Sequence, residues 1–238
     1  MIDFWKRLYH SQQFHPTILG VFVNPFYFAR KGLYRNINFL SKSISGRVLD
    51  IGCGQKPYEQ LFSCDEYIGI ESDTPQNRLG KKADIFYDGF TIPFADHYFD
   101  CIFISQVFEH VFNPDQLLDE IYRLLKPQGY LLMTVPFIWD EHEQPHDFAR
   151  YSSFGIRHLL EKKGFKIIVQ RKSVNDIRVI FQLIAVSIYK KTPLKNKYLD
   201  LLRTLFFIAP FNILGEVLAR ITPSNDDLYL DNIVLARK

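Results

Sequence analysis

The chain has 238 residues, of which 47% are hydrophobic and 23% charged, enough apolar material for one globular domain and an appended subdomain. Its formal net charge of +3 does not favour a nucleic-acid partner. Cys53, Cys64 and Cys101 are odd in number and lack metal-ligand spacing, and no signal-peptide pattern follows Lys6 and Arg7. We therefore expect reduced thiols and a cytoplasmic protein.

Residues 1–45 precede the first strand pattern and are expected to form an N-terminal helical cap. Apolar residues recur at helical spacing in residues 4–9, and a second aromatic and basic helical pattern covers residues 26–40. These helices would cover the sheet edge and a bound ligand. Alternatively, they would form an aromatic lid over an amphiphilic substrate.

Residues 47–54 read R-V-L-D-I-G-C-G and organise the rest of the chain. Val48, Leu49 and Ile51 form the short apolar run of a strand buried on both faces, which Asp50 interrupts near its end. Gly52 and Gly54 then permit a tight turn and close approach of a ligand. Pro57 follows, where it can open a short helix over residues 58–62. In an open parallel sheet, such a strand tip is where ligands bind.

Two cofactor classes use a tip of this kind. A dinucleotide requires G-x-G-x-x-G, but Pro57 occupies the last position, which disfavours NAD. The other class carries no phosphate: it is S-adenosylmethionine, whose amino-acid end packs against the glycine turn. The motif D-I-G-C-G resembles motif I of class I S-adenosylmethionine-dependent methyltransferases.

Two acidic residues extend this resemblance. Glu71 ends the second expected strand, about twenty residues beyond the glycine turn, where a carboxylate accepts ribose hydroxyls. The segment G-F-T-I-P-F-A-D-H-Y-F-D, residues 89–100, resembles the L-P-F-x-D-x-x-F-D signature of the type 11, ubiquinone-biosynthesis-like methyltransferases. In that family the acid five residues before the proline binds the adenine amino group, and Asp88 stands at that position.

The resemblance continues to about Pro136. Q-V-F-E-H-V, residues 106–111, resembles an L-E-H-V motif beside the sulfonium, and R-L-L-K-P-Q-G resembles R-V-L-K-P-G-G. The family implies a Rossmann-like α/β fold: a seven-stranded mixed sheet of order 3-2-1-4-5-7-6, with the last strand antiparallel and helices on both faces. It also implies S-adenosylmethionine as the cofactor, bound by Asp50, Gly52, Cys53, Gly54, Glu71, Ser72, Asp88, Gly89, Ser105, Gln106 and His110.

Residues 136–151 read P-F-I-W-D-E-H-E-Q-P-H-D-F-A-R-Y and follow a strand on the ligand side of the sheet. They resemble a subgroup of these methyltransferases associated with bacterial surface polysaccharides. We expect a loop that binds substrate and carries a general base, with His110, His142, His146 and Asp147 as candidates. We expect no metal ion, because Pro145 disfavours a helix carrying both His142 and His146.

Strands are expected over residues 165–170 and 228–236, after a helix that begins at Ser152 or Ser153. The methyltransferase domain would comprise residues 46–174 and 226–238. Between them, residues 175–225 would form a helical insertion, apolar over 177–189 and 198–221. Arg203, Glu216 and Arg220 argue against a membrane span. A hairpin packed on the domain, peripheral membrane contact and a homodimer face are the alternatives.

The sequence therefore predicts transfer of a methyl group to a small-molecule, glycan or lipid-linked acceptor, at oxygen. Two alternatives stay open at this point. One is an NAD-type oxidoreductase on a related sheet. The other is a non-catalytic, membrane-associated or scaffolding protein that retains the fold.

Overall fold

The computed structural model describes residues 11–194 and 196–238 and divides the chain into two compact units. One unit joins Met1–Arg35 with Lys172–Asp231, and the other joins Asn36–Arg171 with Asn232–Lys238. The helical pattern predicted for residues 4–9 lies outside the described residues. The expected three-part division, with breaks at residues 45, 174 and 225, stays a prediction.

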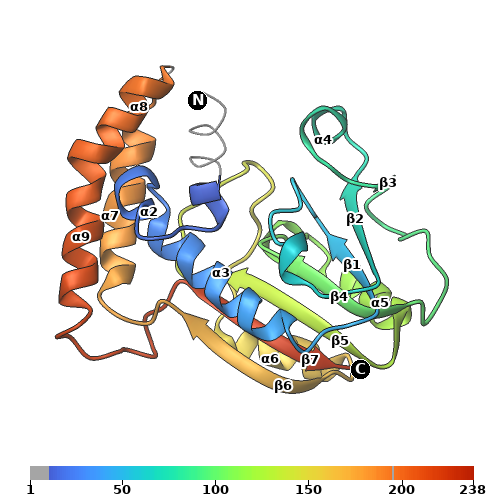
Figure 1. The fold of residues 1–238 in the computed structure, drawn as a ribbon. Helices are drawn as coiled ribbons and strands as arrows, with labels where there is room; N and C mark the ends of the chain where they lie inside the picture. Colours follow the sequence, from blue (N-terminus) through green and yellow to red (C-terminus); the bar gives the residue numbers. More distant parts are fainter. Residues whose placement is uncertain (1–10, 195) are drawn as a thin grey trace. The chain divides into compact units, whose positions relative to one another are not determined.

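The sheet has seven strands in the order β3-β2-β1-β4-β5-β7-β6, as predicted (Figure 1). Its strands are β1 (Arg47–Ile51), β2 (Glu66–Ser72), β3 (Ile85–Tyr87), β4 (Phe99–Ser105), β5 (Leu125–Pro136), β6 (Lys166–Ser173) and β7 (Asp231–Arg237). The pairs β1–β2, β1–β4, β2–β3 and β4–β5 are parallel. Lys238, after the end of β7, exchanges backbone hydrogen bonds with Gln128 and Gly129 near the start of β5. The last strand therefore runs antiparallel to its neighbour.

The main helices of the sheet unit are α5 (Pro114–Leu124), α6 (Ser153–Lys162) and the last residues of α3 (Tyr27–Ser41). Both α3 and α6 begin within one residue of the start that the sequence predicts. The Ser152 side chain accepts from Gly155 N and caps α6. Figure 1 shows α5 and α6 behind the sheet and the end of α3 in front of it.

Three local elements differ from expectation. The helix expected over residues 58–62 is only a single 3₁₀ turn, η1 (Glu59–Leu61). The helix α4 (Pro75–Gly80) was not foreseen, although Thr74 caps it by accepting from Asn77 N. The apolar run after Gly129 predicts a strand over residues 130–135, but β5 starts at Leu125, because Leu125 pairs with Phe99 before a register shift.

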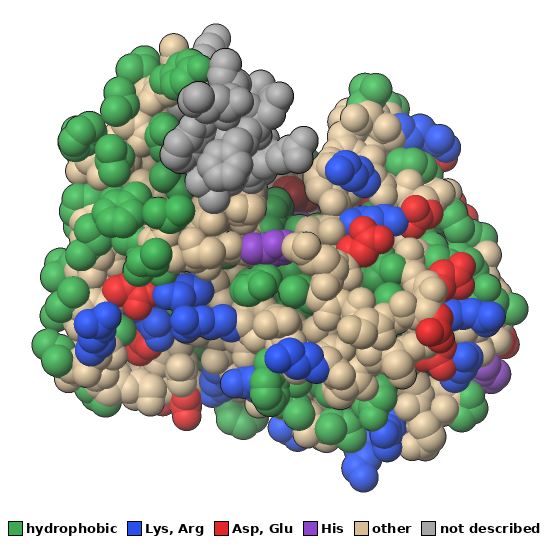
Figure 2. Space-filling model, viewed as in Figure 1, with side chains coloured by type: hydrophobic (Ala, Val, Ile, Leu, Met, Phe, Trp, Pro, Cys, Tyr) green, Lys and Arg blue, Asp and Glu red, His purple; other side chains and the backbone are tan. Residues whose placement is uncertain are grey.

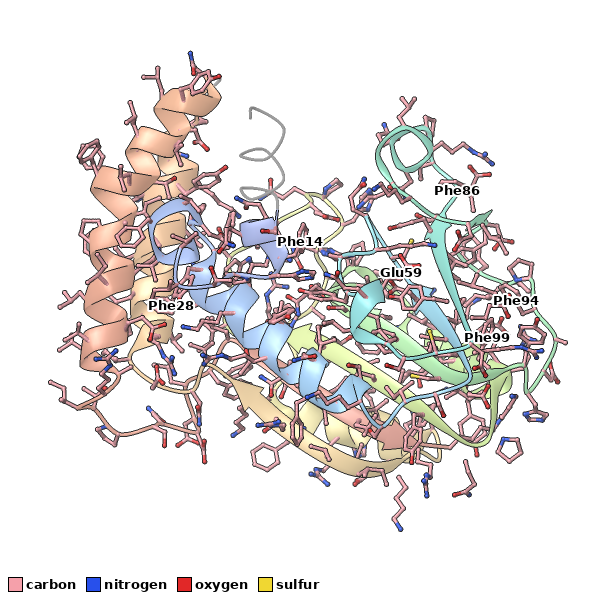
Figure 3. The ribbon with its side chains drawn as sticks, in the orientation of Figure 1. Phe14, Phe28, Glu59, Phe86, Phe94 and Phe99 are labelled. Atoms are coloured by element: carbon pink, nitrogen blue, oxygen red, sulfur yellow. The ribbon has the colours of Figure 1, made fainter. Side chains whose placement is uncertain are left out.

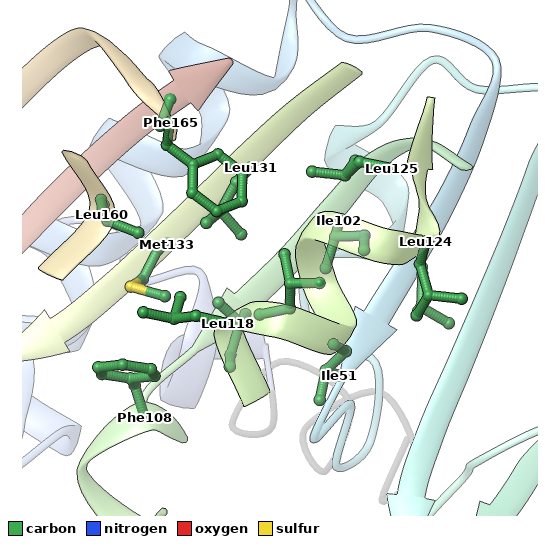
Figure 4. Close-up of a cluster of buried hydrophobic side chains, with 14 of the residues drawn as sticks. Ile51, Ile102, Phe108, Leu118, Leu124, Leu125, Leu131, Met133, Leu160 and Phe165 are labelled. Carbon is green, nitrogen blue, oxygen red and sulfur yellow. The ribbon is translucent and has the colours of Figure 1, made fainter. Parts of the chain in front are cut away.

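The core of the sheet unit is apolar on the face that α5 and α6 cover. Leu118, Ile121 and Leu124 recur along α5 at helical spacing and are fully buried against β4 and β5 (Figure 4). At the amino end of β4, the Phe94 ring meets the Phe99 ring edge to face, with 4.9 Å between ring centroids (Figure 3). This packing holds α5 and the central strands in fixed positions relative to one another.

The helical unit contains α2 (Gly20–Val23), α7 (Arg178–Lys191), α8 (Lys197–Arg203), the π-helical segment η3 (Thr204–Ile208) and α9 (Ala209–Leu218). Buried amides lock it together. The Gln182 side chain donates to Pro25 O and accepts from Ala29 N, while Asn212 donates to Val21 O. Among the described residues, Tyr198–Leu218 is long and apolar enough to cross a membrane, which by itself is weak evidence of a span.

Candidate active site

The glycine turn after β1 has the backbone geometry that its sequence requires. Gly52 and Gly54 have φ of +70° and +57°, the left-handed region that glycine adopts without strain. A Cβ at Gly52 would lie 2.3 Å from Val107 Cγ2, whereas a Cβ at Gly54 would meet no atom within 4 Å. The first glycine therefore permits close packing inside the protein, and the second leaves open space at the strand tip.

Glu71, near the end of β2, and Asp88, directly after β3, lie at the same edge of the sheet. The buried Glu71 accepts from Gly54 N at 2.7 Å through Oε1, so it is tied to the glycine turn. The exposed Asp88 accepts from Phe90 N and Thr91 N through Oδ1, and these hydrogen bonds lower its pKa. In each carboxylate the second oxygen offers further acceptor capacity.

The flanking residues expected at the cofactor site also lie at these strand ends. The Ser72 hydroxyl accepts from Asn77 Nδ2 at 2.9 Å, which joins the end of β2 to α4. Gly89 has φ of +85°, and a Cβ there would meet open space. Asp88 therefore sits in a turn whose next residue leaves room for a ligand.

Asp50 and Cys53, which lie before and within the glycine turn, are buried in the protein interior. The Tyr67 hydroxyl donates to Asp50 Oδ2 at 2.7 Å. Burial raises the pKa of Asp50 to about 7, and this hydrogen bond only partly opposes the rise. Burial also raises the pKa of the Cys53 thiol to about 12, which makes it an unreactive packing group.

Ser105, the last residue of β4, and Gln106, which follows it, both contact Thr134 of β5. The Ser105 hydroxyl lies 2.8 Å from Thr134 Oγ1, and Gln106 N donates to Thr134 O at 3.0 Å. Gln106 has φ of +58°, a rare conformation for a residue with a side chain. It turns the chain sharply, so that Val107 reaches Gly52 and the next residues form the 3₁₀ turn η2 (Phe108–His110).

A carboxylate and two imidazoles converge immediately after this turn. Glu109 is fully buried, and its Oε1 lies 3.9 Å from both His110 Nε2 and His142 Nε2. The two rings meet edge to face at 4.7 Å between centroids. The structure therefore brings together two of the predicted base candidates, with Glu109 as a residue that the sequence analysis did not single out.

Backbone oxygens fix the tautomers of both histidines. His110 Nδ1 lies 2.7 Å from His146 O, and His142 Nδ1 lies 3.2 Å from Asp140 O. A carbonyl oxygen only accepts, so these two contacts favour a proton on Nδ1 of each ring, while Arg150 Nη2 also lies 3.4 Å from His142 Nδ1. With this tautomer each neutral ring has an unprotonated Nε2, which lies 3.9 Å from Glu109 Oε1. Burial lowers the pKa of His142 below its usual value, which favours this neutral form.

Asp147 and His146 hold the loop in place. The nearly buried Asp147 carboxylate accepts from both terminal nitrogens of Arg150 at 2.5 and 2.6 Å and from His142 N at 3.0 Å. The Arg150 guanidinium lowers the pKa of Asp147 to about 2. His146 contributes its backbone carbonyl to His110, while its exposed ring lies 6.2 Å from that of Phe148.

The cluster of Glu109, His110 and His142 has the donor atoms of a metal site. These atoms lie within 4.8 Å of one another. Ligands at about 2.1 Å from a tetrahedral ion are only about 3.4 Å apart. The observed separations are wider, so the cluster would have to contract around an ion, whereas it already suits proton transfer through a hydroxyl placed between its members.

Comparison with known proteins places the chain in a family. A family model described as a methyltransferase domain matches residues 26–170, more than half of the chain. An uncharacterized methyltransferase of Mycobacterium leprae is 36% identical over 104 residues, which is 40% of this chain and 38% of the relative. The match thus spans well under two thirds of that relative.

Two solved structures share the fold. The crystal structure of the [4+2]-cyclase SpnF matches this chain with a TM-score of 0.59 at 18% sequence identity. The match covers 88% of this chain and 82% of the SpnF chain. Haemonchus contortus phosphoethanolamine N-methyltransferase 2, in complex with S-adenosyl-L-methionine, has a TM-score of 0.54 at 19% identity, covering 96% of this chain and 59% of its own.

The chain belongs to the methyltransferase-domain family. Family and fold confirm the prediction of a class I S-adenosylmethionine-dependent methyltransferase, an enzyme that acts on a methyl acceptor. The family assignment disfavours the NAD-type oxidoreductase.

Proposed function

We propose that the described strand ends hold S-adenosylmethionine and that the enzyme transfers its methyl group to an oxygen of the acceptor. When bound, the cofactor supplies an electrophilic methyl group on a sulfonium. The open space at Gly54 fits its amino-acid end, Glu71 fits the ribose hydroxyls, and Asp88 fits the adenine amino group. A carboxylate suits such donors because it only accepts hydrogen bonds.

The observation that carries oxygen as the acceptor atom is the pair of imidazole Nε2 atoms that lie 3.9 Å from the buried Glu109 carboxylate. A hydroxyl is a poor nucleophile until a base removes its proton. We assign this role to His142, because burial keeps it neutral near pH 7. As His142 gains the proton at Nε2, the Glu109 carboxylate stabilises the resulting imidazolium. His110 positions the pair through its hydrogen bond to His146 O.

The acceptor class in this proposal is a hydroxylated small molecule, a glycan or a lipid-linked intermediate. Residues 137–150 support it, because they form an irregular segment after β5, at the edge of the sheet that carries the glycine turn. Loops on a rigid scaffold commonly determine which substrate binds.

The test measures methyl transfer from labelled cofactor to the polar and lipid fractions of a cell extract. We expect His142→Ala to lower transfer by about 100-fold or more, with the affinity for S-adenosylhomocysteine unchanged. The exposed His158 provides the matched control, and His158→Ala should retain full transfer. Full transfer by His142→Ala would disprove its role as base. Labelling confined to amine acceptors would disprove transfer to oxygen.

A further inference from the structure

One face of the helical hairpin in the helical unit is apolar and exposed. The described exposed residues of Tyr198–Leu218 are Tyr198, Leu199, Leu202, Leu205, Phe206, Phe207, Pro210, Ile213, Leu214 and Val217. None is charged, and their spacing follows successive helical turns. Figure 2 shows hydrophobic side chains gathered over α8 and α9. Phe206 and Phe207 are each 65% exposed. An apolar face of this extent marks a surface that another phase or molecule covers.

The charged residues of the same segment turn inward and are paired. Arg203 is buried, contacts Asp200 and donates to Tyr189 O. Glu216 lies 2.6 Å from Lys31 Nζ and 3.8 Å from Arg178 Nη1. The segment therefore has a polar, packed side and an uncharged outer side, which is the pattern of a helix lying on an apolar medium.

The packed side also excludes complete immersion in lipid. Asn212 is fully buried and donates to Val21 O, and Phe28 lies against Gly215. These contacts join α9 to α2 and α3 within the unit. Because protein covers one side of the helix, only the outer side is free to meet a bilayer.

Basic residues flank the apolar face at both ends. Lys190 and Lys191 are exposed at the end of α7, and Arg220 is exposed just beyond α9. Between residues 190 and 221, no acidic side chain is exposed among the described residues. This charge distribution complements anionic lipid headgroups above an apolar layer.

We propose that the outer face of α8, η3 and α9 binds the surface of a bilayer containing anionic lipid. The apolar side chains enter the boundary between headgroups and acyl chains, and the flanking Lys and Arg side chains contact the headgroups. The protein would thereby be membrane-associated without spanning the membrane. The inference does not depend on the identity of the methyl acceptor.

The experiment is co-sedimentation of the full chain with phosphatidylcholine vesicles, with and without about 30% phosphatidylglycerol. We expect binding that is stronger with phosphatidylglycerol and weaker in high salt. The double variant Phe206→Glu and Phe207→Glu should lower the partition coefficient at least tenfold. Phe154 is 81% exposed on α6, and Phe154→Glu is the matched control that should bind as wild type does. Lys190→Gln with Lys191→Gln should weaken binding about tenfold to anionic vesicles only.

Equal unfolding midpoints and S-adenosylhomocysteine affinities will show that the variants fold. The proposal would be overturned if wild-type protein did not co-sediment with either vesicle type, or if the double Phe variant bound vesicles as wild type does. Sedimentation velocity tests a second copy as the occupant. A dimer that the double Phe variant abolishes, with no vesicle binding by wild type, would assign this face to self-association instead.

Discussion

Val107 Cγ2 lies 2.3 Å from the position that a Cβ would take at Gly52. The residue that follows β1 and the residue that leads into η2 are therefore close together, and no side chain fits at Gly52 unless Val107 moves. Because η2 carries Glu109 and His110, this contact couples the cofactor turn to the proposed base cluster.

The two glycines should respond differently to substitution. We expect Gly52→Ala to destabilise the fold by about 1–3 kcal/mol, through overpacking and its positive φ, and Val107→Ala in the same chain to recover part of this loss. Gly54→Ala meets open space, so its unfolding midpoint should fall less while S-adenosylhomocysteine affinity falls at least tenfold. Thermal unfolding and calorimetric titration measure both quantities. Wild-type affinity in folded Gly54→Ala would mean that no ligand approaches this turn.

Substitutions of Asp88 can separate adenine recognition from turn formation. Asp88→Asn retains an oxygen that can accept from Phe90 N and Thr91 N, so the turn should persist. It loses the charge and one acceptor, and we expect cofactor affinity to fall about tenfold. Asp88→Ala should lose both the turn and the affinity. Calorimetric titration with S-adenosylhomocysteine measures the effect, and equal affinity of wild type and Asp88→Asn would remove Asp88 from the site.

Asp50 should make stability depend on pH. Burial raises its folded-state pKa from 3.8 to about 7, so between these values the folded state binds more protons than the unfolded state. The free energy of unfolding contributed by Asp50 therefore decreases as pH rises through this window, by roughly 1 kcal/mol per pH unit. Asp50→Asn should remove this slope because an amide does not titrate. Its oxygen can still accept from the Tyr67 hydroxyl, so the hydrogen bond should persist. Urea unfolding of both proteins from pH 4 to pH 8 checks it. Parallel curves would show an unshifted carboxyl.

Chelation should distinguish a base from a metal ion at Glu109, His110 and His142. Their donor atoms are more widely separated than ligands around a bound ion. We therefore expect dialysis against a strong chelator to leave methyl transfer within twofold of the untreated enzyme. Loss of transfer that added Zn²⁺, Mn²⁺ or Ni²⁺ restores would assign the cluster to metal binding, and elemental analysis of the purified protein would then identify the ion.

The sequence predicts the sheet well because its order follows from ordered motifs and buried apolar runs. It predicts the acidic positions at the strand tips for the same reason, since the ends of parallel strands share one edge. The sequence does not single out Glu109, because its burial and its approach to His142 depend on the tertiary fold, in which residues 137–150 contact η2. Asp147 illustrates the converse: the sequence makes it a candidate base beside the histidines, but Arg150 lies three residues further on and pairs with it. The helix α4 is too short to produce a periodic pattern.

Main-chain atoms join the loop to η2 at two points: His146 O accepts from His110 Nδ1, and Phe148 N donates to Glu109 O at 2.9 Å. Under the proposed function, the loop that selects the acceptor and the histidines that supply the base are therefore structurally coupled. A chimera that imported residues 137–150 from a methyltransferase of other specificity could also shift the backbone oxygen that contacts His110 Nδ1. Redesign of this loop must preserve the path of its backbone at residues 146 and 148, whatever side chains it presents to the new substrate.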